Sequence, residues 1–449
     1  MNWKRPMGGP SLYNYFRLMY YLGSLLRHAY WSRDRLEGYQ NRKVREIVTY
    51  AYDHVPFYHE KFKQLGLKPG DIKGVEDLNR LPIVRKEELQ RSNETISHEF
   101  NNANLLVEPT SGSTGQPLFV YLTRREEEFR KAKLLRANIN CGQKPRDRWA
   151  VIASPRHRSG MARIQKWLGI FAPASSSVLD DTTAQISFVE RFRPDVLESY
   201  SGSLLLIAKE LEKRGIEIAS PRLVIGGAEL IGGGERRFIE KVFDAPFYDQ
   251  YSSVEFDALS WECEERTGYH VDADTVVMQF VDDDGEEVAP GEKGEIVCTS
   301  LFNQAMPFIR YAIDDVGTSS EATECSCGRM LPLMKLVEGR KESFFVLPHG
   351  RVVSPRVIVS TVMSFKFYSH FYHFRIVQKK VDLIELIIQM KEDIVDRKVV
   401  KDELVAHFRK MLRITADEVA LEVKFVENIP LDKSGKLAAV VSELKATNW

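Results

Sequence analysis

The sequence predicts an α/β protein with a large N-terminal domain, in which helices cover β-sheets, and a small α+β C-terminal domain. Three observations lead to this prediction. At 449 residues, the chain is too long for one ordinary hydrophobic core. Strand-like and helix-like segments alternate between residues 195 and 253. From about residue 340 the pattern changes to that of a smaller unit, so we expect domains at residues 1–339 and 340–449.

Residues 1–100 predict a mainly helical entry region. Residues 11–31 carry apolar side chains at helical spacing, interrupted by Arg17 and Arg27. A helix packed on the main domain is the favoured interpretation of this segment, and a helix lying on a membrane surface is the alternative. Residues 35–55 have helical periodicity, which the following proline is expected to end.

The middle of the chain predicts a βαβαβ unit. Three strand-like segments alternate with two helix-like segments, in the order 195–200, 202–215, 221–230, 233–243 and 246–253. Such a unit forms a largely parallel sheet covered by helices. Ligands of these sheets bind at the carboxyl ends of strands, and residues 226–229 and 251–255 lie at two such ends. We therefore expect the functional site there.

Two further parts of the chain are rich in predicted strands. Residues 275–301 hold two strands around turn-forming Asp-Asp-Gly and Pro-Gly sequences. Residues 383–390 and 420–427 are strand-like, and an amphipathic helix at 397–413 lies between them. One face of this helix is expected to carry Val400, Leu404, Phe408 and Met411.

Composition and charge exclude several classes of protein. Lys plus Arg equals Asp plus Glu at 63 each, so no global attraction to nucleic acid or anionic lipid is expected. No apolar run has the length that a transmembrane helix needs. No secretory signal pattern follows the N-terminus, so we expect a cytoplasmic protein. Its five cysteines are then expected as thiols or metal ligands rather than disulfides.

The sequence TSGSTGQP at residues 110–117 is a candidate phosphate-binding loop. Its two glycines permit close approach of a ligand, and its hydroxyl and backbone N–H groups can converge on phosphate oxygens. A Walker A loop would end in Gly-Lys-Ser/Thr, whereas Gln116 and Pro117 stand here. The segment is therefore either a phosphate loop that takes its cation from elsewhere or a flexible surface loop.

Four further segments carry candidate nucleotide-site residues. Glu255, just beyond a strand end, can hold Mg²⁺ against phosphates. The sequence FIRYAIDDVG carries Asp314 and Asp315, and a carboxylate there can accept hydrogen bonds from two ribose hydroxyls. Residues 339–343 suggest a linker with a positioned arginine, and residues 430–437 form a glycine-containing turn with two lysines. Taken singly, each segment has an ordinary alternative as a solvated glutamate, a turn, a linker or an exposed loop.

The order and spacing of these segments resemble the adenylate-forming superfamily of acyl-CoA synthetases and adenylation domains over about residues 40–440. Within it, the sequence is most similar to the branch of phenylacetate-CoA ligases and CapK-type proteins. AYDHVPFYHEKF at 51–62 resembles the N-terminal signature of that branch. IGGAELIGGGERRFIEKVF at 225–243 resembles its Gly-Gly-Ala/Glu-Glu segment, and GRMLPLMKLVEGR at 328–340 the stretch ahead of its hinge.

The resemblance implies roles for the residues at matching positions. It makes Glu255 the catalytic glutamate associated with Mg²⁺ and Lys436 the catalytic lysine, delivered by a small mobile C-terminal domain. Glu342 falls near the hinge of that domain. It assigns binding of the nucleotide and its neighbours to Thr110, Ser111, Gly112, Ser113, Thr114, Gly115, Gly227, Ala228, Glu229, Tyr251, Ser252, Asp315 and Arg340.

The sequence departs from the family pattern in three places. An Arg-Tyr-Arg-Thr-Gly-Asp pattern is RYAIDD here, ending at Asp315, so an arginine and a glycine are missing. The hinge residue is Glu342 instead of the usual Asp, and a Tyr-Gly-x-x-Glu pattern is YSSVE, without its glycine. These changes bear on the acceptor and on the domain movement more than on ATP binding.

A candidate metal site consists of Cys263, His270, Cys325 and Cys327, four ligands of the type that zinc prefers. The spacing is not that of a standard zinc finger, but relatives in this branch have the same grouping. Because four protein ligands leave no open position, the grouping predicts a structural Zn²⁺ site. The alternative is three unrelated thiols and a surface histidine.

The resemblance implies an AMP-forming acid–thiol ligase. ATP and a carboxylic acid would give an acyl-adenylate and pyrophosphate, and the acyl group would pass to coenzyme A. The CapK-type alternative passes it to an amine or sugar in capsular or exopolysaccharide biosynthesis. A non-catalytic nucleotide-binding homologue is a further alternative, against which the retained Lys436 argues. The expected cofactors are ATP, Mg²⁺, coenzyme A and structural Zn²⁺, and a homodimer is expected because relatives are often dimers.

Overall fold

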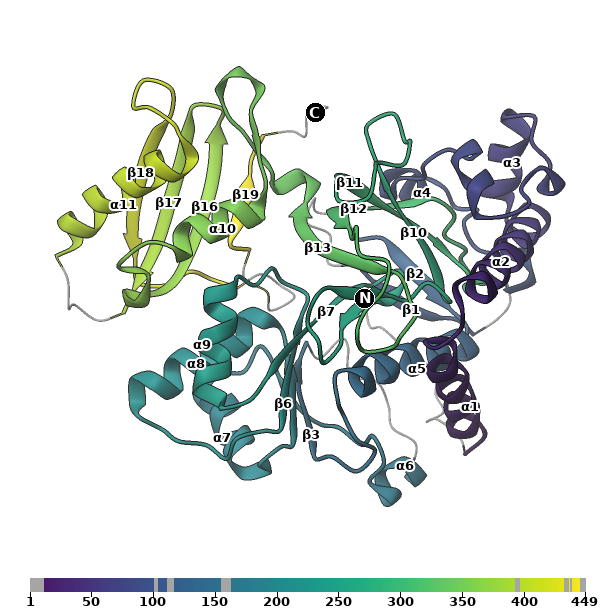
Figure 1. Cartoon of the computed structure of the whole chain (residues 1–449), viewed down its shortest axis with the longest axis horizontal. Helices are drawn as coiled ribbons and strands as arrows, with labels where there is room; N and C mark the ends of the chain where they lie inside the picture. Colours follow the sequence, from purple (N-terminus) through teal and green to yellow (C-terminus); the bar gives the residue numbers. More distant parts are fainter. Residues whose placement is uncertain are drawn as a thin grey trace.

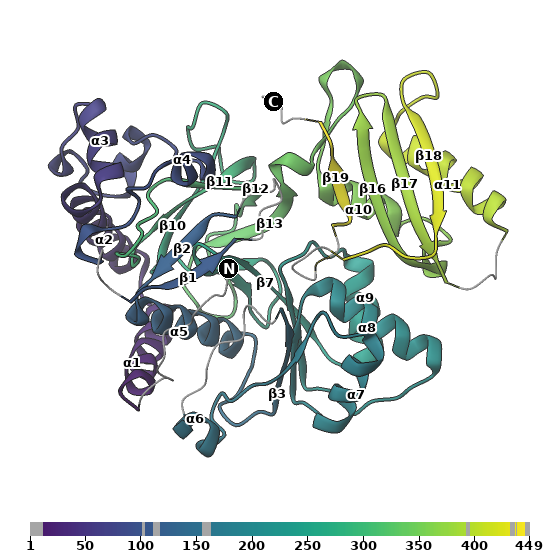
Figure 2. The same ribbon diagram turned by 180° about the vertical axis from the view of Figure 1, so that it is seen from behind.

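The chain folds into two lobes of unequal size (Figure 1). The computed structural model describes residues 12–100, 104–110, 117–154, 163–391, 396–431, 436 and 438–444. We call residues 12–340 the N-terminal lobe and residues 345–442 the C-terminal lobe. Seen from behind, the C-terminal lobe lies beside the helices α8 (Ser201–Arg214) and α9 (Gly233–Phe243) of its neighbour (Figure 2).

Helices form the entry region, as predicted. They are α1 (Leu12–His28), α2 (Arg33–His54), α3 (Pro56–Gln64) and α4 (Lys86–Arg91). α1 buries Leu18, Leu22 and Leu25 against the core that includes α5 (Arg124–Asn140), which confirms the packed helix. Pro56 ends α2, as expected, and also begins α3, because proline is favoured in the first turn of a helix.

An eleven-stranded mixed sheet forms the centre of the N-terminal lobe. Its order is β10, β11, β12, β13, β9, β8, β7, β6, β5, β3, β4. The bounds are β3 (Trp149–Ala153), β4 (Ala174–Ser177), β5 (Val196–Ser199), β6 (Leu223–Gly227), β7 (Phe247–Ser253), β8 (Asp257–Glu262), β9 (Tyr269–Val271), β10 (Val276–Val281), β11 (Lys293–Ser300), β12 (Tyr311–Ser319) and β13 (Leu333–Arg340). The strands from β4 to β7 along this order run parallel, and all other neighbouring pairs are antiparallel.

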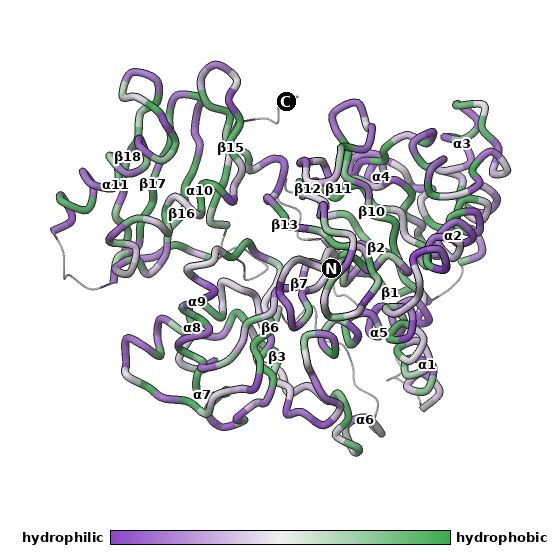
Figure 3. Tube along the Cα trace, in the orientation of Figure 1, coloured by the Kyte–Doolittle hydropathy of each residue, from purple (hydrophilic) through white to green (hydrophobic). Residues whose placement is uncertain are grey.

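The predicted βαβαβ unit is confirmed as β5, α8, β6, α9 and β7. Its strands and helices, with β3 and α7 (Thr182–Phe192), share one hydrophobic core. Local signals set the helix ends. The Asp181 carboxylate accepts a hydrogen bond from the N–H of Ala184 at 2.8 Å at the start of α7, and Gly215 ends α8 with φ of 62°. Figure 3 shows the apolar residues along β6 and β10 of the sheet.

Two smaller features complete this lobe. The antiparallel hairpin of β1 (Leu106–Pro109) and β2 (Phe119–Leu122) lies on either side of the candidate phosphate loop. The short helix α6 (Arg163–Leu168) follows β3. β10 and β11 pair antiparallel, which confirms the two strands predicted at 275–301.

The C-terminal lobe has its own sheet and its own core. The sheet order is β18, β17, β16, β19, with bounds β16 (Phe371–Lys380), β17 (Leu383–Met390), β18 (Ala420–Val426) and β19 (Val440–Ser442). The hairpin of β14 (Phe345–Val346) and β15 (Val352–Val353), together with α10 (Pro355–Met363) and α11 (Arg397–Leu412), completes the lobe. All members of this hydrophobic core come from residues 345–440. The predicted strand–helix–strand order at 383–427 is confirmed.

One predicted core residue of α11 is wrong. Val400, Leu404 and Phe408 are fully buried, but Met411 is 48% exposed. Leu412 takes the next buried position, since a spacing of four from Phe408 continues the stripe along one face of the helix.

The described residues include all five cysteines of the chain. All five cysteines are free thiols. In the part of the chain that the structure describes, no helix combines the length and the apolar character needed to cross a bilayer.

Candidate active site

The carboxyl ends of β6 and β7 form one corner of the candidate site. Gly227, the last residue of β6, pairs with Gln250 on β7. A Cβ at position 227 would lie 2.7 Å from the Gln250 carbonyl oxygen, so this approach requires glycine. Ala228 follows with φ of 66°, a left-handed conformation that is uncommon for a residue with a side chain. The sheet register therefore brings residues 227–229 to the strand that carries Tyr251.

Glu229 contacts the start of α8. One of its carboxylate oxygens, Oε2, accepts a hydrogen bond from the N–H of Gly202 at 2.7 Å. This contact satisfies one of the N–H groups that the first turn of a helix leaves open, and the helix N-terminus favours the negative charge. Glu229 thus joins the loop after β6 to α8, and its predicted contact with a cofactor stays a prediction.

Asp315 is the buried centre of a polar cluster on the adjoining strands. Its carboxylate accepts a hydrogen bond from the hydroxyl of Tyr251 at 2.7 Å and pairs with Nε of Arg340 at 3.1 Å. Asp315 is only 7% exposed, and its charge raises the pKa of the Arg340 guanidinium. Burial, together with Asp315, holds the pKa of Tyr251 well above its usual value. The tyrosine is therefore a neutral donor, and the aspartate accepts from two sides.

A bulge in β12 aims Asp315 at this cluster. Between the pairs Val297–Ala312 and Glu295–Val316, β12 has three residues where β11 has one. At the centre of the bulge, Asp314 has φ of 65°. This is the position where the family pattern has a glycine, and aspartate is among the few other residues that adopt this conformation readily. The missing glycine therefore leaves the backbone shape of the motif in place.

Glu255 lies two residues beyond the end of β7 and is 7% exposed. Its Oε1 accepts a hydrogen bond from the hydroxyl of Tyr311 at 3.0 Å. Burial and the charge of Glu255 raise the pKa of Tyr311, which is therefore a donor as well. Sequence reasoning missed Tyr311, although it stands in the same RYAIDD motif as Asp315. The motif thus supplies an orienting partner for Glu255 in addition to the aspartate.

Thr110 closes the base of the candidate phosphate loop. Its N–H donates to the Leu118 carbonyl at 2.8 Å, and its hydroxyl accepts from the Leu118 N–H at 3.0 Å. The rest of the predicted loop, Ser111, Gly112, Ser113, Thr114 and Gly115, lies outside the described residues. Ser252 is paired with Ala258 across β7 and β8, at the position where the family pattern has its other glycine.

Lys436 reaches the N-terminal lobe from the C-terminal end of the chain. Its Nζ lies 5.5 Å from the centroid of the Tyr200 ring, within the range of a cation–π contact. Tyr200 stands between the end of β5 and the start of α8. Because β5 neighbours β6 in the sheet, Lys436 lies at the same edge as Gly227.

The four predicted metal ligands meet in a cluster apart from this edge. The ligand atoms of Cys263, His270, Cys325 and Cys327 all lie within 4.8 Å of one another. The sulfurs of Cys263 and Cys325 are 3.7 Å apart, and Sγ of Cys327 is 3.3 Å from Nε2 of His270. Tetrahedral Zn²⁺ with Zn–S bonds of about 2.3 Å places two sulfurs about 3.8 Å apart, so the thiols fit the ion.

The histidine of this cluster has the environment of a metal ligand. Burial lowers the pKa of His270 to about 4, so the ring is neutral at pH 7 and free to offer a lone pair. Its other nitrogen, Nδ1, lies 3.4 Å from the carbonyl of Leu331, the kind of partner that orients a ligating imidazole. Within the hairpin of β8 and β9, this ring stacks on Trp261.

Curated relatives resemble the chain over nearly its whole length. It is 25% identical over 441 residues to the phenylacetate-coenzyme A ligase of Thermus thermophilus, which covers 91% of this chain and 97% of the relative. It is 22% identical over 423 residues to protein CapK of Staphylococcus aureus, covering 90% and 89%. No model of a known protein family matches the chain. These similarities confirm the resemblance to the adenylate-forming superfamily, in its phenylacetate-CoA ligase and CapK branch.

Solved structures of adenylate-forming ligases share the fold. A structure of 2-hydroxyisobutyryl-CoA ligase in the postadenylation state superposes with a TM-score of 0.76 at 17% identity, covering 93% of this chain and 91% of that one. The same ligase in complex with 2-HIB-AMP and CoA in the thioesterification state has a TM-score of 0.60 over the same shares. The present structure therefore superposes better on the postadenylation structure than on the thioesterification structure of the same ligase.

Proposed function

We propose that the protein is an AMP-forming ligase that activates a carboxylic acid with ATP and transfers the acyl group to coenzyme A. In the first step, a carboxylate oxygen attacks the α-phosphorus of ATP, and the bond to the β-phosphate breaks to release pyrophosphate. In the second, the thiol sulfur of coenzyme A attacks the acyl carbonyl, AMP leaves, and the thiol proton goes to solvent. The relatives and structural neighbours with this fold are named for this class of reaction.

The observation that carries the proposal is the meeting of buried carboxylates and cations at one sheet edge. Asp315 and Arg340 are paired there, and Lys436 arrives at the same edge from the second lobe. Both reactants of the first step are anionic, so a cation aimed at the reacting phosphate stabilises the charge that develops in the transition state. We assign this role to Lys436.

The remaining polar groups suit a nucleotide. A carboxylate offers about four acceptor positions, of which Tyr251 and Arg340 use two on Asp315. The two that remain match the two ribose hydroxyls of ATP. We propose that Tyr251 lies beside the adenine ring and that the loop beginning at Thr110 binds the β- and γ-phosphates. We assign the binding of Mg²⁺ to Glu255. When bound, Mg²⁺ offsets the charge of the phosphates.

We further propose that residues 1–339 and 340–449 are the two functional domains. Arg340 ends β13, and the turn at 341–343 that follows leads into the separate core of the C-terminal lobe. The better superposition on a postadenylation structure supports the view that this arrangement belongs to the first step.

We propose that the cluster of Cys263, His270, Cys325 and Cys327 binds Zn²⁺ for structure. These four residues would fill all positions of a tetrahedral ion and would leave none open for a substrate. The ion would join the hairpin of β8 and β9 to the turn at 325–327.

Acid-dependent release of pyrophosphate tests the proposed activity. Purified protein with Mg-ATP is offered aryl, fatty, amino and sugar acids, with and without coenzyme A. We expect release with one of these classes, and a decrease of about 10²–10³-fold or more in the Lys436→Ala variant. Absence of release with every class, or full activity of the variant, would contradict the proposal and favour a nucleotide-binding homologue.

The same assay distinguishes the acceptors. Release that rises with coenzyme A and yields a thioester supports the ligase. Release that rises only with an added amine or sugar would support the CapK-type alternative, for which the similarity to CapK is the motivating observation. The expected homodimer stays a prediction.

A further inference from the structure

Helix α8 of the N-terminal lobe contacts the C-terminal lobe through a buried lysine. Nζ of Lys209 on α8 donates hydrogen bonds to the carbonyls of Phe371 at 3.1 Å and Tyr372 at 2.9 Å, the first two residues of β16. Lys209 is only 5% exposed. Its ammonium therefore leaves water when the lobes meet, and the two carbonyls replace that water.

A second polar contact lies beside the first. The hydroxyl of Tyr368 donates to Oε1 of Glu235 on α9 at 2.9 Å, and Nζ of Lys209 lies 5.2 Å from the Tyr368 ring. Glu235 is also 5% exposed. We call Lys209, Glu235 and Tyr368 the docking cluster. It brings one cation, one carboxylate and one hydroxyl together across the interface between the lobes.

The start of β16 is shaped for this contact. Its pairing with β17 shifts between Phe371 and His373, so Tyr372 lies at an irregularity of the ladder. A bulge of this kind leaves backbone groups out of the regular hydrogen-bond pattern. The Lys209 ammonium accordingly satisfies carbonyls that would otherwise need water in the joined lobes.

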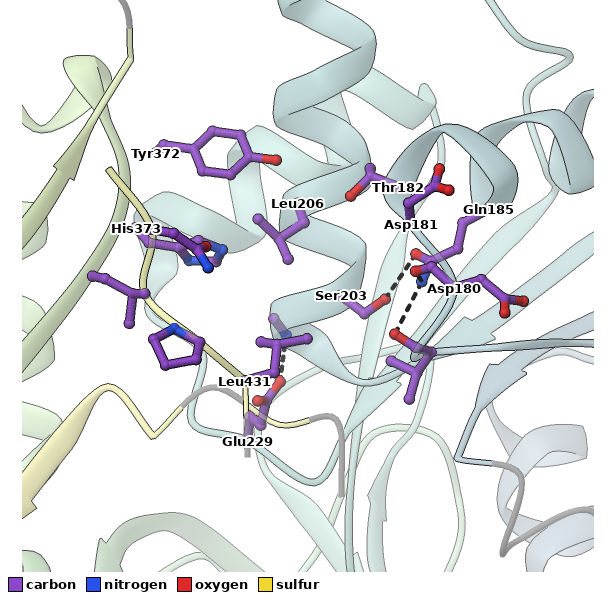
Figure 4. Close-up of a pocket in the computed structure, with 15 residues that line it drawn as sticks. Asp180, Asp181, Thr182, Gln185, Ser203, Leu206, Glu229, Tyr372, His373 and Leu431 are labelled. Atoms are coloured by element: carbon purple, nitrogen blue, oxygen red, sulfur yellow. Dashed lines mark hydrogen bonds between the residues drawn. The ribbon is translucent and has the colours of Figure 1, made fainter. Parts of the chain in front are cut away.

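The interface around the docking cluster is not closely packed. A cavity of about 310 Å³ separates the lobes next to it. Figure 4 shows Gln185, Ser203 and Glu229 of the N-terminal lobe on one side and His373 and Leu431 on the other. Because the lobes make no van der Waals contacts across this cavity, the polar contacts contribute more to the relative orientation of the lobes.

α8 links the docking cluster to the catalytic lysine. Tyr200 at its start is the residue over which Lys436 lies, and Lys209 stands further along the same helix. Both contacts join one rigid helix to the C-terminal lobe, so the position of β16 on Lys209 also sets where Lys436 meets the sheet edge.

We propose that Lys209 is a positioning residue for acyl-adenylate formation. It holds the C-terminal lobe in the arrangement that delivers Lys436 to the nucleotide, and Tyr368 and Glu235 assist it. The inference rests on the proposed function for its kinetic consequence. When the lobes part, the ammonium returns to water, so the contact is reversible.

Lys209→Met tests the kinetic consequence. Methionine keeps most of the length of the side chain but leaves two carbonyls and the Glu235 carboxylate without their cation. We expect adenylate formation, measured as acid-dependent pyrophosphate release, to slow by roughly three- to tenfold. Transfer from added acyl-adenylate to coenzyme A, a step to which we assign no role for Lys436, should stay within twofold or rise. A merely structural loss would slow both steps together.

Lys213→Met is the matched control, because Lys213 lies on the same helix with an exposed side chain. It should leave both steps unchanged. Equal slowing of both steps in Lys209→Met, or no slowing of the first step, would overturn the proposal.

Labelling of Lys209 tests docking without any activity. In the parent protein, acetylation of Lys209 by acetic anhydride, followed by mass spectrometry, should be much slower than that of Lys213. The amine of Lys209 is shielded from the reagent while the lobes are joined, so the rate of its labelling reports how often they part. Tyr368→Phe should speed labelling of Lys209 severalfold and leave Lys213 unchanged.

The two experiments fail in different ways. If no acid gives pyrophosphate, the proposed function fails and the labelling result alone decides the docking role. If Lys209 in the parent reacts as fast as Lys213, or if Tyr368→Phe changes nothing, the docking role fails whatever the activity.

Discussion

Replacing Asp315 by asparagine should weaken ATP binding by about 10- to 100-fold. The carboxylate already accepts from Tyr251 at 2.7 Å and pairs with Arg340 at 3.1 Å, which leaves it about two acceptor positions for a ribose. Asparagine keeps the size but has a single acceptor oxygen. That oxygen cannot serve both protein partners and both ribose hydroxyls.

The magnitude follows from the lost contacts. A hydrogen bond to a charged acceptor contributes about 1.5–3 kcal/mol, and each 1.4 kcal/mol is about tenfold in affinity. The protein partners of Asp315 compete for the same oxygen, so the loss is at least one such bond. Arg340, without its counter-charge, would also lose the cause of its raised pKa.

The assay compares ATP with 2′-deoxy- and 3′-deoxy-ATP in acid-dependent pyrophosphate release. The parent should discriminate against both analogues in KM, whereas Asp315→Asn should treat all three nucleotides nearly alike, because the contact is already gone. A change in KM for ATP of less than twofold, with discrimination kept, would refute the assignment of the ribose to Asp315.

Two further predictions concern the metal cluster and the bulge of β12. Purified protein should hold about one equivalent of zinc. Cys327→Ser should lose the zinc and have a lower Tm, whereas the control Cys298→Ala, outside the cluster, should keep the metal. A parent protein without zinc and with freely reactive thiols would contradict the site. Asp314→Gly should raise the Tm, because a left-handed backbone still costs aspartate up to about 1 kcal/mol that glycine avoids. Burial raises the pKa of Asp314 to about 6, so its ionisation opposes folding as the pH rises through 6, and the gain should be larger at pH 8 than at pH 5. A gain that is absent, or larger at pH 5, would show that burial of the charge is not the cause.

Local signals made much of the fold predictable. The βαβαβ unit follows from continuous apolar strands alternating with amphipathic helices, and Gly215 marks the end of α8 as its sequence position suggested. The metal cluster was also predictable as a grouping, because its ligand types are rare and chemically specific.

Contacts between distant segments were not predictable from pattern. The pairing of β9 with β13 joins Tyr269 to Met334, and no local signal marks that partner. The bulge at Asp314 lay hidden because aspartate there replaces the glycine that would have announced a left-handed residue.

The contact of Lys209 with β16 depends on how the lobes meet, which is set by tertiary packing alone. In α11, a spacing of three or of four from Phe408 fits a helix face equally well. The packing of the whole lobe determines that Leu412 is buried and Met411 is exposed.

The most direct test of the proposed adenylation measures the transfer of a carboxylate oxygen from the acid to AMP. With the acid that gives the fastest pyrophosphate release, supplied with ¹⁸O in its carboxylate, attack on the α-phosphorus moves one labelled oxygen into AMP when the acyl group leaves. We predict one ¹⁸O in the AMP and none in the pyrophosphate, and no labelled AMP with Lys436→Ala on the same time scale. Label in inorganic phosphate with ADP as the other product, or unlabelled AMP, would contradict the proposed chemistry.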